Sequence, residues 1–370
     1  MTSWTTKKLG EVCEIISPGI KKFEGSKKYV ATADVDFDKI VNFTEITYKN
    51  RPSRANIEVK ENDVLVARMA ETKKFLIADK NLQDNYIFST GFAVMRVKEE
   101  LTPRYLFYFL TTKDFNLQKD KLAVGATQKA INNPALKKIK IPLPPLKIQQ
   151  KIVERLDAIK KAQELNDKQI QLAEELFQSL LHRELDPKGK NWEVKKLREV
   201  CEELFAGGDV PKNNFSKIKT EKYFIPIFTN GVEGKDLYGY TDIKKVIKPA
   251  VTISARGTIG YSSLRKEPFY PIIRLIVLIP NKTIDLNFLY YTTSSFKFFN
   301  TGTSIPQLTI PMIKNLKIPL PPLETQQKIV EKLSAAQEYK KKLLEQKQKL
   351  QELFESVLNK SFKGVLENSC

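Results

Sequence analysis

The sequence contains few of the residues on which metal and nucleophile chemistry depend. Its 370 residues include one histidine and three cysteines, which are Cys13, Cys201 and Cys370. A single histidine argues against a histidine-ligated metal site and against a histidine-dependent catalytic triad. Three scattered cysteines do not form a disulfide framework or a CxxC metal site, and they favour a reduced, cytoplasmic setting. We therefore predict no metal site and no catalytic residue.

Long apolar runs and nucleotide-binding motifs are also missing. No apolar run reaches the roughly 20 residues that span a bilayer, and the first residues, MTSWTTKKLG, form no apolar signal segment. No G-x-x-x-x-G-K-[ST] string is present to hold phosphates. The segment Asn133-Pro134-Ala135 does not complete the Asn/Asp-Pro-Pro-aromatic string of an adenine methyltransferase. We predict that the chain binds no cofactor itself and does not enter a membrane.

Positive charge is abundant and unevenly distributed. The chain has 62 basic and 43 acidic side chains, a net charge of +19. Residues 1–147 and 186–322 each carry a net charge of +9, whereas residues 148–185 carry −1 and residues 323–370 carry +2. A basic excess of this size indicates a polyanionic partner, with nucleic acid first and a membrane surface second. A lysine-rich surface alone could explain the total, but it does not predict the alternation.

The chain is a tandem repeat. Trp4 to Glu14 matches Trp192 to Glu202, and Arg68 matches Arg256 at the same spacing of 188 residues. Two later strings, KIPLPPL and QQKIVE, recur at a spacing of 177 residues, at 140–146 and 317–323 and at 149–154 and 326–331. The ends of the two halves are alike and their middles differ. A duplication that kept its scaffold and varied its basic middle explains this pattern.

Each half combines strands with a short aromatic helix. Apolar runs bounded by turn residues predict strands, and aromatic-rich runs predict helices. The expected strands are 63–68, 92–97, 250–254 and 275–279, and the expected helices are 105–110 and 288–293. The predicted fold class is therefore α+β in both halves.

A long helix is expected after each PLPPL string. Apolar residues alternate at steps of four and three, the heptad pattern of a coiled coil. A helix over residues 148–183 would be about 54 Å long, at about 1.5 Å per residue. We predict that the two helices pair as an antiparallel coiled coil, although two separate amphipathic helices on a globular core are an alternative. The predicted seam residues are Ile152, Leu156, Ile159, Ile170, Phe177 and Leu180, with Ile329, Leu333, Leu343, Leu350, Phe354 and Val357.

These strings resemble a known family. Two halves that each end in IPLPPL and a QQKIVE helix are similar to the DNA-specificity (S) subunits of type I restriction–modification systems. The segments at 302–308 (GTSIPQL) and 253–260 (ISARGTIG), and the Trp-Lys-Leu-Gly-Glu-Val start, also look like this family. The first half departs from it, with GATQKAI at 125–131 and Met69-Ala70-Glu71 in place of the glycine-rich loop.

The resemblance implies a layout and partners. It implies two target-recognition domains in tandem, each reading one half of a bipartite double-stranded DNA site, with paired helices that set the gap. It implies assembly with two methyltransferase (M) subunits and with restriction (R) subunits, to which S-adenosylmethionine, ATP and Mg²⁺ would belong. The expected segments are recognition domain 1 at 1–147, spacer helix 1 at 148–185, recognition domain 2 at 186–322, spacer helix 2 at 323–362 and a tail at 363–370.

DNA contacts would come from the basic, variable halves. Arginine and glutamine can read base edges, while lysine mostly meets phosphates. The candidates are Arg68, Lys73, Lys74, Gln128 and Lys129 in the first half, and Arg256, Thr258, Ser304 and Gln307 in the second.

Two other functions fit parts of the sequence. Asp63, Glu71 and Lys73 could hold Mg²⁺ in a self-sufficient nuclease, since two acids and a lysine are common in such sites. The paired helices could also belong to a scaffold that binds only proteins.

Overall fold

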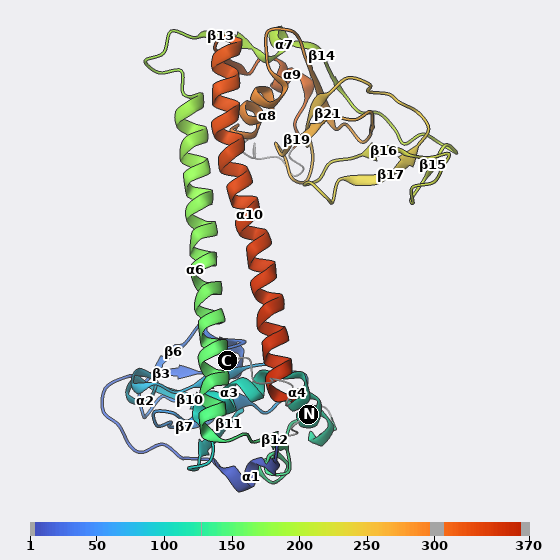
Figure 1. The fold of residues 1–370 in the computed structure, drawn as a ribbon. Helices are drawn as coiled ribbons and strands as arrows, with labels where there is room; N and C mark the ends of the chain where they lie inside the picture. Colours follow the sequence, from blue (N-terminus) through green and yellow to red (C-terminus); the bar gives the residue numbers. More distant parts are fainter. Residues whose placement is uncertain (1–3, 127, 297–306, 364–370) are drawn as a thin grey trace. The chain divides into compact units, whose positions relative to one another are not determined.

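The computed structural model describes residues 4–126, 128–296 and 307–363, and it consists of two compact units. The first unit takes Met1–Asp167 and Gln346–Cys370, and the second takes Lys168–Glu345. Each unit therefore contains one globular part and one half of each of two long helices, α6 (Leu146–Leu185) and α10 (Leu323–Phe362). Each unit is described by itself below (Figure 1).

The first unit is built around an antiparallel sheet in the order β2-β11-β8-β9. Successive side chains of a strand point to opposite faces. Along the central strand β8, Val64 and Val66 pack into one core, and Leu65 and Ala67 pack into another. Because both faces are buried, the strand is an unbroken apolar run in the sequence. The four strands are β2 (Cys13–Ile16), β8 (Val64–Ala67), β9 (Phe75–Ile77) and β11 (Phe92–Val97).

Helices cover one face of this sheet and a second sheet covers the other. The core on the helical face includes side chains of α3 (Pro103–Thr111) and α4 (Lys113–Leu122), together with residues of α6 and α10. The second sheet has the order β6-β3-β10-β7 and contains one parallel pair, β3 with β10. Its strands are β3 (Lys27–Val30), β6 (Thr44–Ile46), β7 (Ala55–Ile57) and β10 (Tyr86–Ser89).

Short elements complete the first unit. Two strands of two residues each form a hairpin before β6, which lies at one edge of the second sheet. A separate two-stranded sheet pairs residues from the start of the globular part with residues from its end. These elements are β1 (Thr6–Lys8), α1 (Leu9–Val12), η1 (Thr32–Asp34), β4 (Val35–Asp36), β5 (Lys39–Ile40), α2 (Lys80–Asn85), α5 (Asn133–Leu136) and β12 (Lys140–Pro142).

The second unit repeats this plan. Its main sheet has the order β14-β21-β18-β19, which matches β2-β11-β8-β9 strand for strand. Its second sheet has the order β15-β17-β16-β20. The elements are β13 (Glu193–Lys196), α7 (Leu197–Val200), β14 (Cys201–Ala206), β15 (Phe215–Ser216), β16 (Ile225–Phe228), β17 (Leu237–Thr241), β18 (Ala250–Ile253), β19 (Ser262–Arg265), β20 (Tyr270–Pro271), β21 (Ile276–Pro280), α8 (Leu286–Ser294), α9 (Ile310–Lys314) and β22 (Lys317–Leu320).

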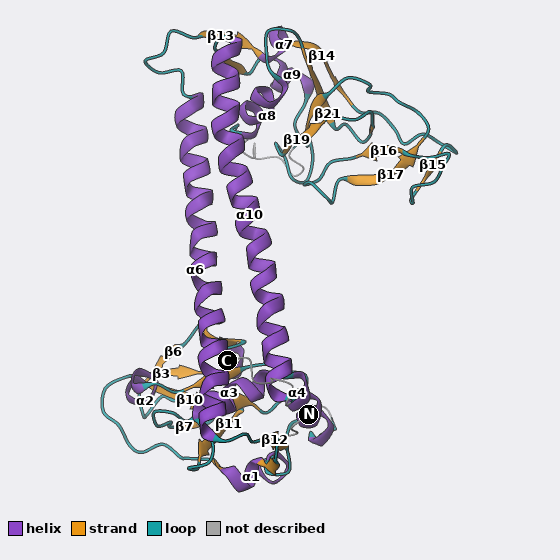
Figure 2. Ribbon diagram, viewed as in Figure 1, coloured by secondary structure: helices purple, strands orange, loops and turns teal. Residues whose placement is uncertain are grey.

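The predicted α+β class is confirmed in both halves, where helices and sheets occur together (Figure 2). The four expected strands are β8, β11, β18 and β21, and the two expected helices are α3 and α8. Among the described residues, no helix is both long and apolar enough to cross a membrane.

A buried glutamine fastens the start of each long helix. Gln149 has no solvent exposure, and its Oε1 accepts a hydrogen bond from the backbone N–H of Thr102 at 2.9 Å. Its Nε2 donates to the carbonyls of Glu100 at 2.8 Å and Pro144 at 2.9 Å. One side chain thus joins the PLPP junction, the first turn of α6 and the residue that caps α3.

The second unit has the same arrangement of hydrogen bonds. The buried Gln326 accepts from the N–H of Asp285 at 2.7 Å and donates to the carbonyls of Thr283 at 3.0 Å and Pro321 at 2.8 Å. Both glutamines are the first residue of the repeated QQKIVE string. The repeat therefore preserves a buried hydrogen-bond pattern as well as a helix.

The helix halves pair antiparallel within each unit. In the first unit, Gln163 donates to the carbonyl of Leu350 at 3.2 Å, and Lys347 pairs with Asp167 at 2.8 Å. In the second unit, Lys340 pairs with Glu174, and Lys332 pairs with Glu184 at 3.2 Å. In both units, residue numbers rise along α6 as those of the paired residues fall along α10, so the two helices run antiparallel. All twelve predicted seam residues are buried or half-buried.

One polar residue of α6 is buried without a hydrogen-bond partner among the described residues. Asn166 is 2% exposed, and neither its Oδ1 nor its Nδ2 has a hydrogen bond within the described residues. An unsatisfied buried amide costs about 1–3 kcal/mol, so Asn166→Leu should raise the free energy of unfolding by about 1–2 kcal/mol. The urea midpoint of the full chain measures this. Gln163→Leu is the matched control, because it removes the hydrogen bond to Leu350 and should not stabilise. A lower midpoint for Asn166→Leu would contradict the prediction.

Candidate nucleic-acid interface

In the second unit, exposed polar residues lie in the loop that follows the central strand β18, at one end of the main sheet. Strand β18 ends at Ile253, and the chain turns through a loop whose Gly257 and Gly260 have φ angles of 69° and 84°. The Gly260 N–H donates to the Ser254 carbonyl at 2.9 Å and closes the loop. The Thr258 hydroxyl lies 3.3 Å from the Ser254 hydroxyl, and Thr258 is exposed. The loop is therefore a fixed turn that presents Arg256 and Thr258 to solvent.

Arg256 meets Gln307 at this end of the sheet. The Arg256 guanidinium donates to Oε1 of Gln307 from Nε at 3.2 Å and from Nη2 at 2.8 Å. The backbone N–H of Leu308 donates to the Ala255 carbonyl at 3.0 Å, which holds the two segments together. Two of the predicted DNA contacts are thus brought side by side, although 51 residues separate them in sequence. Ser304, a third candidate, lies outside the described residues.

A further arginine joins the pair. Arg274, which is exposed, directs its Nη1 to the same Oε1 of Gln307 at 3.5 Å. Arg274 was not among the residues predicted to contact DNA.

Arg68 occupies the corresponding position in the first unit but has different surroundings. Its Nε donates to the Phe92 carbonyl at 3.1 Å and its Nη1 donates to the Ile131 carbonyl at 3.3 Å. The side chain is half-buried, and burial lowers its pKa. The Arg68 side chain therefore holds the backbone around its loop in place, whereas the Arg256 side chain is exposed to solvent.

The remaining candidates of the first half are divided among three places. Backbone bonds from Ala70 to Lys129, and from Ile131 to Arg68, both 2.9 Å, bring segment 128–131 against the loop after β8. Gln128 and Lys129 are exposed there. Lys74 is turned inward and donates to the Thr32 carbonyl at 2.7 Å.

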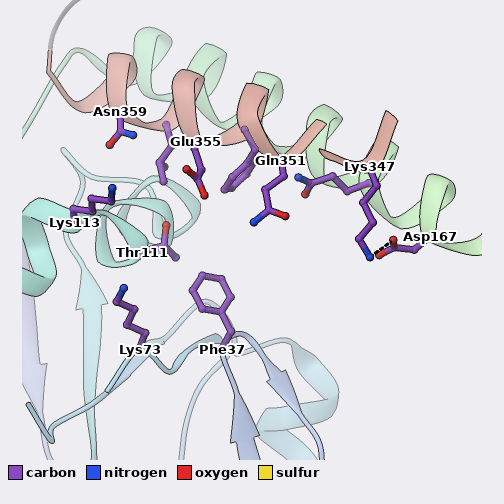
Figure 3. Close-up of a pocket in the computed structure, with 12 residues that line it drawn as sticks. Phe37, Lys73, Thr111, Lys113, Asp167, Lys347, Gln351, Glu355 and Asn359 are labelled. Carbon is purple, nitrogen blue, oxygen red and sulfur yellow. Dashed lines mark ion pairs between the residues drawn. The ribbon is translucent and has the colours of Figure 1, made fainter. Parts of the chain in front are cut away.

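Lys73 extends into a cleft inside the first unit (Figure 3). The cleft has a volume of about 490 Å³. Lys73, Phe37, Thr111 and Lys113 line it from the globular part, and both long helices line it from the other side. Lys73 thus lies between the globular part and the helices. The helix residues that line it are Gln163, Asp167, Lys347, Gln351, Phe354, Glu355, Leu358 and Asn359.

A buried lysine that the sequence analysis missed shapes the loop after β8. Lys119 of α4 has no solvent exposure, and its ammonium donates to the carbonyls of Met69, at 3.2 Å, and of Thr72. Burial lowers the pKa of this lysine. Glu71, with a φ of 61°, is held by a bond from its N–H to Oδ1 of Asp120 at 2.9 Å. A lysine in an amphipathic helix resembles a surface residue in sequence, and only the fold buries it.

The geometry is against the proposed nuclease site. Asp63 and Glu71 flank β8 at opposite ends, and a strand rises about 3.3 Å per residue, so their carboxylates cannot share one ion. Asp63 is buried and accepts two bonds from Arg96, both at 2.8 Å. Among the described residues, no group of three His, Cys, Asp or Glu side chains could hold a metal ion. The nuclease interpretation of Asp63, Glu71 and Lys73 is wrong.

Comparison with known proteins identifies the family. The model of the type I restriction modification DNA specificity domain matches residues 1–175 and again residues 189–353. The chain belongs to this family. The resemblance found in the sequence is confirmed, and the tandem repeat is a pair of type I DNA-specificity domains.

Relatives in this family are distant in sequence. A Mycoplasma pneumoniae protein provisionally named type I specificity subunit S.MpnORF507P is 28% identical over 242 residues, which is 64% of this chain and 65% of that protein. The type I restriction enzyme MjaVIII specificity subunit of Methanocaldococcus jannaschii is 24% identical over 401 residues, 96% of this chain and 90% of that protein.

Solved structures of the family share the fold. The HsdS subunit from Thermoanaerobacter tengcongensis has a TM-score of 0.56 at 25% identity, covering 99% of this chain and 98% of that one. A chain from a structure of complex assembly and conformational transition of the type I R-M system has a TM-score of 0.71 at 24% identity, covering 99% of both chains. The chain therefore shares the fold of these family members along almost its full length.

Proposed function

We propose that this chain is the non-catalytic specificity subunit of a type I restriction–modification enzyme, and that each globular domain reads one half of a bipartite double-stranded DNA sequence. The observation that carries the proposal is the tandem match to one DNA-specificity domain. Two copies of a DNA-reading domain on one chain can read two half-sites, and the equal net charges of +9 fit this division. The recognition domains would be 1–147 and 186–322, with spacers 148–185 and 323–362 and a tail at 363–370.

Within each domain, arginine and glutamine would read bases and lysine would meet phosphates. Arg256 and Thr258 in the loop after β18, and Gln128 and Lys129 in the first domain, are exposed and free to approach DNA, whereas Gln307 is half-buried beside Arg256. Arg68 and Lys74 would act indirectly, because their side chains already hold backbone carbonyls. Lys73, in the cleft, would contact a phosphate only if DNA reached that side of the domain.

Catalysis would belong to partner subunits in the cytoplasm. The proposal includes two M subunits, which would use S-adenosylmethionine to methylate adenine, and R subunits, which would use ATP and Mg²⁺. Its support is family membership and the likeness to a chain from a type I R-M assembly.

Co-expression of the chain with its M subunit, followed by mapping of methylated adenines, tests the proposal. We expect methylation at one bipartite motif with a fixed gap. The purified complex should also prefer duplexes that carry this motif over random duplexes. Methylation without sequence preference would contradict the proposal. Absence of DNA binding even at low salt would favour the protein-only scaffold, because basic surfaces bind DNA most tightly at low salt.

A further inference from the structure

A strained turn lies beside Arg256 and Gln307 in the second domain. Between β20 and β21 the chain reverses through Ile273 and Arg274, whose φ angles are 52° and 60°. Residues other than glycine rarely adopt positive φ, and for a β-branched residue such as isoleucine it is an outlier. Such strain persists where the surrounding structure determines the conformation, and it concentrates at functional sites.

Hydrogen bonds from two neighbouring segments hold the turn. The N–H groups of Ile273 and Arg274 donate to the carbonyls of Gly208 at 2.8 Å and Gly207 at 2.9 Å. The side-chain amide of Asn230 donates to the Ile273 carbonyl at 2.7 Å. A Cβ on Gly207 would lie 2.7 Å from the backbone of Pro271, so only glycine fits beside the turn. The backbone is therefore fixed, while the side chains of Ile273, 43% exposed, and Arg274 face solvent.

Among the described residues of the domain, no negative charge balances the arginines at this turn. Arg256 and Arg274 both donate to the single Oε1 of Gln307, at 2.8 Å and 3.5 Å. In the part of the chain that the structure describes, no carboxylate forms an ion pair with either arginine. Two guanidiniums gathered around one neutral oxygen repel each other, and their other N–H groups, which are exposed to solvent, are available to acceptors from outside the domain.

The edge of guanine provides such acceptors. Its O6 and N7 lie side by side in the major groove and accept two hydrogen bonds from one guanidinium, while an apolar side chain suits the methyl group of thymine. We propose that the Ile273–Arg274 turn is the base-reading element of the second domain. Arg274 contacts a guanine of the second half-site, Ile273 contacts the neighbouring base, and Gln307 positions Arg274 beside Arg256. This inference rests on the proposed function and names the residues that give the second domain its specificity.

Arginine-to-lysine exchange in the assembled complex with M subunits tests the inference. Lysine keeps the positive charge and loses the two-pronged contact. Arg274→Lys should relax one position of the methylated motif, in the half read by the second domain. Arg274→Ala should lower affinity for the cognate duplex at least ten-fold and change affinity for random duplex much less. Arg198→Lys is the matched control, because this exposed arginine of α7 lies at the other end of β14, and it should leave the motif unchanged.

Three results would overturn the inference. They are an unchanged motif with Arg274→Lys, an equal loss of affinity for cognate and random duplex with Arg274→Ala, which marks a phosphate contact, and loss of M-subunit assembly, which marks a protein contact. Each requires a wild-type complex with a bipartite motif. A wild-type complex without sequence preference would instead refute the proposed function.

Gln307→Glu tests the positioning role separately. Glutamate has nearly the same shape as glutamine, and its carboxylate would form ion pairs with both arginines. We expect at least a ten-fold loss of cognate affinity and a shallower dependence of binding on salt concentration, because fewer free cations reach the DNA. Thermal unfolding should be unchanged, which shows that the fold is kept. Cognate affinity equal to wild type would show that Gln307 does not position the arginines.

Discussion

Replacing Gln149 by leucine should lower the free energy of unfolding of the first unit by about 3–5 kcal/mol, since each buried polar group left without a partner costs about 1–3 kcal/mol. Leucine fits a similar volume, but it cannot accept from Thr102 or donate to Glu100 and Pro144. These three backbone groups are held by a side chain with no solvent exposure, so water does not replace it without a change in packing.

The effect should be confined to one unit. The chain has two tryptophans, and one falls in each unit. Trp4 donates from its indole Nε1 to the Ser361 carbonyl at 3.2 Å, and Trp192 packs against the core of the second unit. In a Trp192→Phe background, fluorescence therefore reports the first unit. In a Trp4→Phe background it reports the second.

The neighbouring glutamines are the controls. Gln150 and Gln327 are exposed, so Gln150→Leu and Gln327→Leu should shift the urea midpoints little. Gln149→Leu should shift the Trp4 transition, and Gln326→Leu should shift the Trp192 transition. Equal shifts for Gln149→Leu and Gln150→Leu would show that the buried hydrogen bonds contribute nothing.

These glutamines show which features of the fold could be predicted from the sequence and which could not. The repeat, the α+β class and the long helices follow from patterns that neighbouring residues determine, such as heptads and apolar runs. Gln149 lies in a polar stretch, QQK, that is typical of a solvated helix surface. It is buried because the residue before α3, 47 positions away in sequence, packs on it, and no local pattern records that contact.

The candidate site shows the same limit. Arg68 and Arg256 share a repeat position, and this correctly indicated that both lie where a central strand enters a loop. Their surroundings differ because their partners come from remote, variable segments. Phe92 and Ile131 surround Arg68, and Gln307 lies beside Arg256. Arg274 was missed because its strained turn depends on Gly207 and Asn230, and neither precedes it closely in sequence.

Lengthening α6 and α10 together by one heptad should abolish methylation of the wild-type motif. Each is a continuous helix of 40 residues that contributes to both units. We place the insertions after Asp167 and after Glu345, where the units meet in sequence, so that each unit keeps its own residues. Seven residues add about 10 Å, at about 1.5 Å per residue, and preserve the heptad phase.

The added helix length changes both the spacing and the rotation of the DNA half-site that the second domain would have to reach. About 10 Å corresponds to about 3 base pairs, and with about 10.5 base pairs per turn the second half-site is rotated by about 100°. Methylation of the original motif should therefore fall at least 100-fold, and remaining methylation should move to a longer gap with lower efficiency. Mapping of methylated adenines after co-expression with the M subunit measures both changes.

A loop insertion separates helix length from chain length. Seven glycine and serine residues placed after Gly189, in the exposed segment between α6 and β13, lengthen the chain by the same amount and leave both helices intact. This variant should keep the wild-type gap. Lengthening α6 alone should break the pairing of Asp167 with Lys347 or of Glu174 with Lys340, because the two helices no longer share one register. If the double helix insertion methylates the wild-type motif as efficiently as the loop insertion does, the helices do not set the gap.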